Sequence, residues 1–192
     1  RALFFENLAL GLFGGGARGN ARIGLRETGW PVEASFTVDN LDLDVFTREF
    51  KPPSLTLTGR VNGSVLAAFS LDGLTGLAVD LRSDEGFSMN KDMVEQLLVS
   101  QYMAGMTGGK QVAEVVRDVL GTAPQRAFDS ARLVLGMEDG RIAGYARLES
   151  AKLNLTVDIK ADPAALLEAL GARDGEKAPA PVEAPEKTQY NW

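Results

Sequence analysis

The chain of 192 residues contains neither cysteine nor histidine. Without cysteine it has no thiol nucleophile, no disulfide and no thiolate metal ligand, and without histidine it lacks the commonest general base and the commonest metal ligand. Most enzyme classes depend on one of these groups. We therefore expect a protein that is not an enzyme and that uses neither a cofactor nor a metal.

Positive charge is also scarce. The sequence has 20 basic against 26 acidic residues, a net charge of -6, and the basic residues are spread along the chain. This disfavours nucleic-acid binding, which needs a clustered basic surface. Neither a signal peptide nor a run of about 20 apolar residues is present. Because the chain opens on Arg1 and runs directly into a strand-like stretch, we interpret it as a fragment whose export signal or anchor lies upstream.

The most informative pattern lies at residues 55–71, where apolar or glycine residues occupy every second position. Such alternation is typical of a strand with one apolar face. At roughly 3.3 Å per residue the strand would extend on the order of 55 Å, far beyond the usual strand of about five or six residues. The alternating positions are Leu55, Leu57, Gly59, Val61, Gly63, Val65, Ala67, Phe69 and Leu71.

A hairpin is the alternative interpretation of this stretch, because Asn62-Gly63 is a strong two-residue turn signal. A turn there would place Val61 opposite Ser64 and would mix apolar and polar side chains on both faces. A register error of one residue moves a whole apolar set into water, so we favour the continuous strand.

The rest of the chain is predicted to be a β-meander with a helical insert. Further strands are expected at 3–13, 18–23, 34–38, 77–81, 131–137, 142–148 and 153–161. Between 89 and 121 the apolar period changes to about 3.6, which predicts a helical hairpin with Asn90 as the first N-cap. Asp162, Pro163 and Gly171 punctuate a short C-terminal helix.

The predicted fold class is therefore α+β and mainly β: a long, twisted, groove-like antiparallel sheet with a helical hairpin and a short C-terminal helix. We expect one domain over residues 1–171. The segment 172–192 is rich in Ala, Pro, Glu and Lys, and this composition predicts a disordered tail.

Three short motifs have plainer explanations than catalysis or binding. Ser88 and Lys91 match S-x-x-K, but no K-T-G or S-D-N accompanies them. Residues 14–19 match G-x-G-x-x-G, but a strand rather than a helix follows, which favours a glycine-rich hairpin. Asp39, Asp42 and Asp44 lack the glycine and glutamate of a calcium loop, so we interpret them as a solvated acidic turn.

The apolar sheet face is the remaining candidate site. It could pack entirely on the helices and bind nothing. However, two helices of about 14 residues would each span only some 20 Å, which is less than the face formed by the long strands. An apolar surface without a protein cover usually marks a ligand site or a partner interface.

One further set of segments is informative: 36–43, 57–63 and 74–81, the last followed by Glu85-Gly86, together with Glu6-Asn7-Leu8 before Phe13-Gly14-Gly15, and Leu153-Asn154-Leu155 before 164–167. These segments resemble the C-terminal regions of AsmA-like proteins, the Gram-negative envelope group related to TamB and YdbH. The similarity extends over residues 1–170. The helical insert at 90–120 is a departure from that pattern.

The resemblance implies a lipid-binding segment of a periplasmic bridge-like protein, anchored in the inner membrane, that carries phospholipid between the two membranes. The implied partners are phospholipid acyl chains, neighbouring domains of the same longer chain and an outer-membrane protein. The alternative is a structural module that pairs with partners through its sheet edges. The residues expected to contact lipid are Leu57, Val61, Val65, Phe69, Leu133, Leu135, Leu153, Leu155 and Val157.

Overall fold

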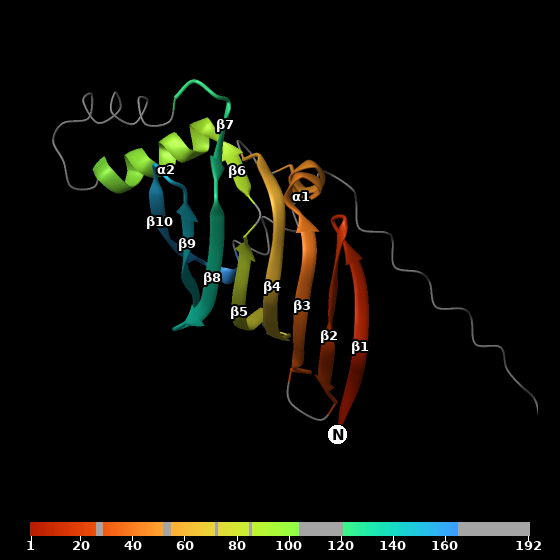
Figure 1. The fold of residues 1–192 in the computed structure, drawn as a ribbon. Helices are drawn as coiled ribbons and strands as arrows, with labels where there is room; N and C mark the ends of the chain where they lie inside the picture. Colours follow the sequence, from red (N-terminus) through yellow and green to blue (C-terminus); the bar gives the residue numbers. More distant parts are fainter. Residues whose placement is uncertain (26–28, 52–54, 72, 85, 104–120, 165–192) are drawn as a thin grey trace, which may run out of the picture.

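The computed structural model describes residues 1–25, 29–51, 55–71, 73–84, 86–103 and 121–164. They form one ten-stranded, open antiparallel sheet whose main path runs β1-β2-β3-β4-β5-β8-β9-β10, as Figure 1 shows. The strands are β1 (Ala2–Leu12), β2 (Gly15–Gly24), β3 (Val32–Asp42), β4 (Leu57–Ser70), β5 (Gly73–Ser83), β6 (Phe87–Asn90), β7 (Gln125–Phe128), β8 (Ser130–Glu138), β9 (Arg141–Glu149) and β10 (Asn154–Ala161). The predicted mainly-β antiparallel fold is confirmed.

The long strand is continuous. β4 runs from Leu57 to Ser70 and passes through Asn62 and Gly63 without a turn. Gly63 has a positive φ of 152°, and a Cβ there would lie 1.9 Å from the Asp80 carbonyl oxygen on β5. A glycine is therefore required at this position by the close approach of two strands rather than by a hairpin.

Two β-bulges with the same chemistry interrupt the pairing. In β1, Glu6 and Asn7 together oppose Asn20 of β2; in β3, Asp39 and Asn40 together oppose Asn62 of β4. Each bulge holds its asparagine at a positive φ, 58° for Asn7 and 54° for Asn40. The backbone N–H of that asparagine donates to the side-chain oxygen of the opposing asparagine, at 3.1 Å in the first bulge and 2.8 Å in the second.

The bulges keep the apolar residues on one face. Along β1, Leu3 and Phe5 occupy odd positions, whereas Leu8 and Leu10 occupy even ones. An inserted residue reverses the alternation, so all four side chains point to the same side of the sheet. The second bulge does the same for Val38 and Leu41 in β3.

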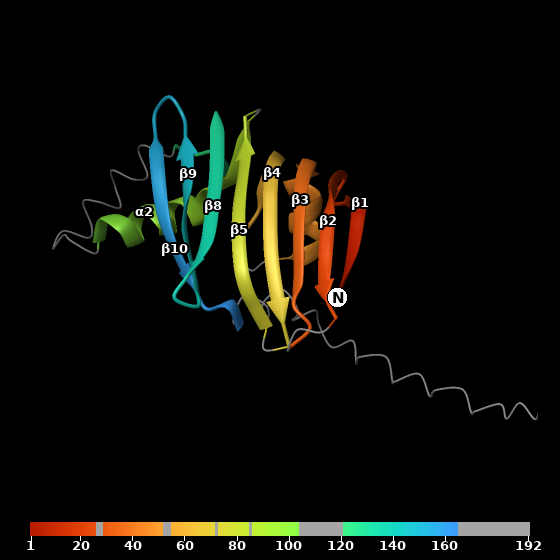
Figure 2. The ribbon, with the colours of Figure 1, turned by 90° about the horizontal axis from the view of Figure 1, so that it is seen from below.

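Two helices cover one end of this apolar face. α1 (Leu43–Phe50) and α2 (Lys91–Met103) lie near one end of the strands in Figure 1 and on one side of the sheet in Figure 2. Neither is long and apolar enough to cross a membrane. Between helices and sheet lies a cluster of buried side chains: Leu43, Val61, Phe87, Val94, Leu98, Phe128, Leu148 and Leu155.

α1 corrects the interpretation of the acidic passage. Asp42 is its N-cap, because the carboxylate Oδ1 accepts from the N–H of Asp44 at 2.9 Å and from that of Val45 at 3.2 Å. Asp44 lies in the first turn, where the helix dipole favours a negative charge. Asp42 and Asp44 therefore start a helix, which the solvated-turn interpretation missed, whereas Asp39 is an exposed residue of the β3 bulge.

The strands β6 and β7 were also not predicted. β6 pairs with the first residues of β4, beyond the point where β5 ends, and β7 pairs with β6. They carry the chain to α2 and back and add Phe87 and Phe128 to the core, with ring centroids 6.1 Å apart.

The remaining helix predictions are tested in part. α2 begins one residue after Asn90, and Val94 and Leu98 of its predicted apolar face are buried. The second helix of the hairpin, at 112–120, and the tail 172–192 lie outside the described residues. Of the C-terminal helix, the start is described: the Ala164 N–H donates to the Asp162 carboxylate at 2.7 Å, which confirms the predicted cap.

The paired asparagines predict a specific loss of stability. Asn62→Ala removes the acceptor for the Asn40 N–H, and we expect the free energy of unfolding to fall by about 1 kcal/mol, the net contribution of a typical hydrogen bond. Asn20→Ala, which removes the acceptor in the first bulge, should have a similar effect. Urea denaturation measures both, with Ser64→Ala as a control on the exposed side of β4; losses no larger than that of the control would contradict the role of the asparagine pairs.

Candidate functional site

The apolar face of the sheet divides into a part under the helices and an open part. Val61 and Leu155 belong to the buried core, at 7% and 2% exposure. Leu57, Leu153 and Val157 pack against that core and are partly buried. These five residues, which were predicted to contact lipid, therefore pack against protein side chains in this structure. The sequence pattern did not distinguish them from the predicted residues that lie outside the core.

Val65, Phe69, Leu133 and Leu135 lie on the same face beyond the core cluster and are half-buried. The cross-strand register places Phe36, Val65, Val79 and Leu135 in one row over four neighbouring strands. The next row toward the helices contains Leu81 and Leu133. These side chains form a continuous apolar surface, which we call the open apolar face, defined by Val65, Phe69, Val79, Leu81, Leu133 and Leu135.

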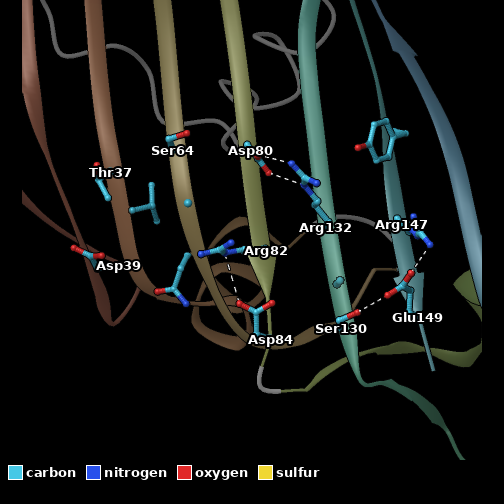
Figure 3. A pocket seen from close by; sticks show the side chains of 15 residues that line it. Thr37, Asp39, Ser64, Asp80, Arg82, Asp84, Ser130, Arg132, Arg147 and Glu149 are labelled. Carbon is cyan, nitrogen blue, oxygen red and sulfur yellow. Dashed lines mark hydrogen bonds and ion pairs between the residues drawn. The ribbon is translucent and has the colours of Figure 1, made fainter. Parts of the chain in front are cut away.

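The opposite face of the sheet is polar and contains a hollow of about 670 Å³. Figure 3 shows its labelled side chains, which come from β3, β4, β5, β8, β9 and the residues that follow β5. Thr37, Ser64 and Tyr145 contribute hydroxyl groups, and charged side chains supply most of the remaining polar lining.

Three arginines lie directly opposite one another in this hollow. The register pairs Arg82 of β5 with Arg132 of β8, and Arg132 with Arg147 of β9. Like charges at directly opposed positions repel, so this row needs counter-charges. They come from Asp84, 3.6 Å from Arg82, from Glu149, 2.6 Å from Arg147, and from Asp80, which accepts two hydrogen bonds from Arg132 at 2.9 and 2.8 Å.

The pairing of Asp80 with Arg132 fixes the charge of the carboxylate. Hydrogen bonds from the Arg132 guanidinium lower the pKa of Asp80 below its ordinary value, which outweighs the opposing effect of partial burial. Asp80 is thus ionised at neutral pH and holds no proton for general acid catalysis. The hollow is a solvated surface of mutually neutralising charges, so the open apolar face is the better candidate for ligand binding.

The short motifs do not form a reactive site in the described residues. The Ser88 hydroxyl is hydrogen-bonded with Thr58 and with Gln125, whereas the Lys91 ammonium donates to the Gly121 carbonyl oxygen. The glycine-rich stretch 14–19 forms the turn of the β1–β2 hairpin and the first part of β2, as predicted. Within the described parts of the chain, no group of three or more metal-ligating side chains occurs.

The arginine row was missed by sequence reasoning. Arg82, Arg132 and Arg147 are far apart in sequence, and only the pairing of β5 with β8 across the helical insert aligns them. Arg82 and Arg132 each follow an apolar residue of an alternating strand, so the sequence is consistent with their place on the polar side. The register between the strands was the missing information.

No family model, curated protein or solved structure matches this chain.

The Asp80–Arg132 pair predicts a pH-dependent effect of Asp80→Asn on stability. Because the pKa of Asp80 is lowered in the folded protein, its ionised form stabilises the fold at neutral pH, and this stabilisation is lost as the pH falls through the folded-state pKa. We expect Asp80→Asn to lower the free energy of unfolding slightly at pH 7 and to have progressively less effect below about pH 4.

Urea denaturation at a series of pH values measures the difference between wild type and variant. High salt should reduce the effect, because both side chains are about half exposed. A difference that stays constant from pH 7 to below pH 4 would assign the effect to packing and contradict the ion pair.

Proposed function

We propose that the open apolar face binds phospholipid acyl chains and that the chain is a non-enzymatic lipid-binding segment of a periplasmic bridge-like protein. The observation that carries the proposal is the row of apolar side chains, with Val65 and Leu135 among them, that continues over neighbouring strands beyond the helices. An apolar surface of this kind usually marks a ligand site or a partner interface.

The chemistry of this face suits a chain of CH₂ groups. Aliphatic side chains offer dispersion contacts without hydrogen-bonding groups that fix a ligand in one position. Burying an acyl chain of about fourteen carbons at about 0.8 kcal/mol per CH₂ would contribute roughly 10 kcal/mol before ordering costs. Such binding is spread over many weak contacts and therefore permits sliding along the sheet.

The periplasmic location and the transport of phospholipid between membranes rest on the resemblance to AsmA-like proteins, and they are proposals with it. The open edges of the sheet agree with a segment that continues into neighbouring domains. The absence of histidine and cysteine, and the separation of Ser88 from Lys91 in their hydrogen bonds, support a function without catalysis.

Charge placed on the two parts of the apolar face tests the proposal. Val65→Asp would set a carboxylate against the acyl chain, which is strongly disfavoured, so we expect a folded protein with lower lipid occupancy. Leu155→Asp would bury an unpaired charge under the helices and should lower the free energy of unfolding by about 3–5 kcal/mol. Leu66→Asp is the matched control, since it places the same charge on another aliphatic position of β4, next to Val65 but on the opposite face of the sheet and 48% exposed.

Native mass spectrometry after mild extraction measures bound phospholipid, and urea denaturation measures stability. The expected result is loss of lipid in Val65→Asp and retention in Leu66→Asp. If wild type carries no lipid, or if folded Val65→Asp keeps as much lipid as Leu66→Asp, the open apolar face is not the lipid site.

A further inference from the structure

The two outer strands of the sheet differ in their protection. Among the described residues, β1 pairs only with β2, yet it exposes Leu3, Phe4 and Phe5 at 46%, 68% and 43%. β10, at the other end, carries Asp158 and Lys160, and α2 packs near it. Charged side chains are a usual means of preventing an outer strand from pairing, and a long, largely apolar outer strand with few of them favours association.

The repeated bulge indicates which kind of strand would pair with the outer edge of β1. β1 pairs with β2 through Glu6-Asn7 opposite Asn20, as β3 pairs with β4 through Asp39-Asn40 opposite Asn62. β1 therefore corresponds to β3. The outer edge of β3, up to Asp39, is covered by β2, whereas the corresponding edge of β1 is covered by no described strand.

The burial of corresponding side chains reflects this difference. Counting back from the bulges, Phe5 corresponds to Val38 and Leu3 to Phe36. Val38 is 6% exposed and Phe36 is half-buried, but Phe5 and Leu3 are both exposed by more than two fifths. A strand added outside β1 would bury both side chains as β2 buries those of β3.

The size of the side chains on β1 determines which residues the added strand can carry opposite them. β2 places Ala17 opposite Val38 and Gly19 opposite Phe36. A Cβ on Gly19 would lie 1.9 Å from the Ser35 carbonyl oxygen and 2.8 Å from the Phe36 ring, so the approach of the strands requires a glycine. Small residues on one strand thus make room for large residues on the next.

We propose that the outer edge of β1, over Ala2–Glu6, binds an antiparallel strand of a partner polypeptide with the chemistry of β2. That strand carries glycine or alanine opposite Leu3 and Phe5 and a cationic side chain opposite Phe4. A cation there is attracted to the exposed ring of Phe4 and to Glu6, the one charged side chain of β1. A second copy of this chain fits less well, because it offers either the large side chains of β1 or the charges of β10.

A peptide with the sequence of residues 15–24 is the probe, and the full chain is the target. Titration of the labelled peptide measures its affinity by fluorescence anisotropy. Phe4→Lys should weaken binding several-fold, because it places a positive charge opposite the cationic side chain of the peptide and because a charge on an outer strand disfavours pairing. Leu71→Lys is the matched control: it replaces another exposed apolar side chain, at 81% exposure, away from β1.

Disulfide trapping tests the register, since the chain has no cysteine of its own. Phe4→Cys in the chain should react several-fold faster with the peptide carrying Arg18→Cys than with peptides carrying Gly16→Cys or Asn20→Cys. The corresponding pair in the structure is Arg18 with Thr37. Faster trapping of this peptide together with selective weakening by Phe4→Lys supports the proposal.

Absence of peptide binding, equal effects of the two lysines, or equal trapping of the three peptides would each overturn the proposal. Dimerisation of the chain without peptide, lost in Phe4→Lys, would instead identify a second copy as the occupant and overturn it as well. Lipid occupancy is measured in a separate experiment. A negative result for peptide binding at β1 therefore does not bear on lipid binding by the open apolar face.

Discussion

The side-chain alternation of the strands is the constraint on which the rest of the structure depends. A strand sends successive side chains to opposite faces, yet the apolar residues of β1 and β3 change from one parity to the other along each strand. The two bulges absorb the difference. Without them, Leu8 and Leu10 of β1 and Leu41 of β3 would turn to the polar side, and Leu41 would no longer pack against the core under the helices. The asparagine pairs supply both the positive φ and the hydrogen bond that each bulge needs.

One apolar face therefore has two uses. At one end α1 and α2 bury it as a conventional core, which supplies the stability of the domain. Farther along the strands the same kind of side chain has no helix above it among the described residues. A single strand can contribute to both: β4 carries Val61 in the core and Val65 on the open apolar face, four residues farther along the same side of the strand.

The sequence alone predicted the strands that alternate strictly and the Asp162 cap of the C-terminal helix. The continuity of β4 was predictable because a hairpin at Asn62-Gly63 would have mixed the faces, and the pattern was interpreted on that basis. α1 was missed because Asp42 was interpreted as solvated rather than as an N-cap, although Asp44 and the following apolar spacing were visible. The division of the apolar residues into covered and open sets was not predictable, because it depends on where α2 lies on the sheet. The arginine row likewise depends on the register between β5 and β8, which are separated by the whole insert.

The unequal outer strands also determine how the sheet behaves in a concentrated solution. Sheets associate into fibres when each copy adds its first strand to the last strand of another, since this contact repeats without closing. Here that contact would bring β1 against β10, whose exposed Asp158 and Lys160 are charges of the kind that disfavour the pairing of an outer strand. The β10 edge therefore opposes the repeated contact, and the exposed apolar edge of β1 does not by itself commit the protein to open-ended polymerisation.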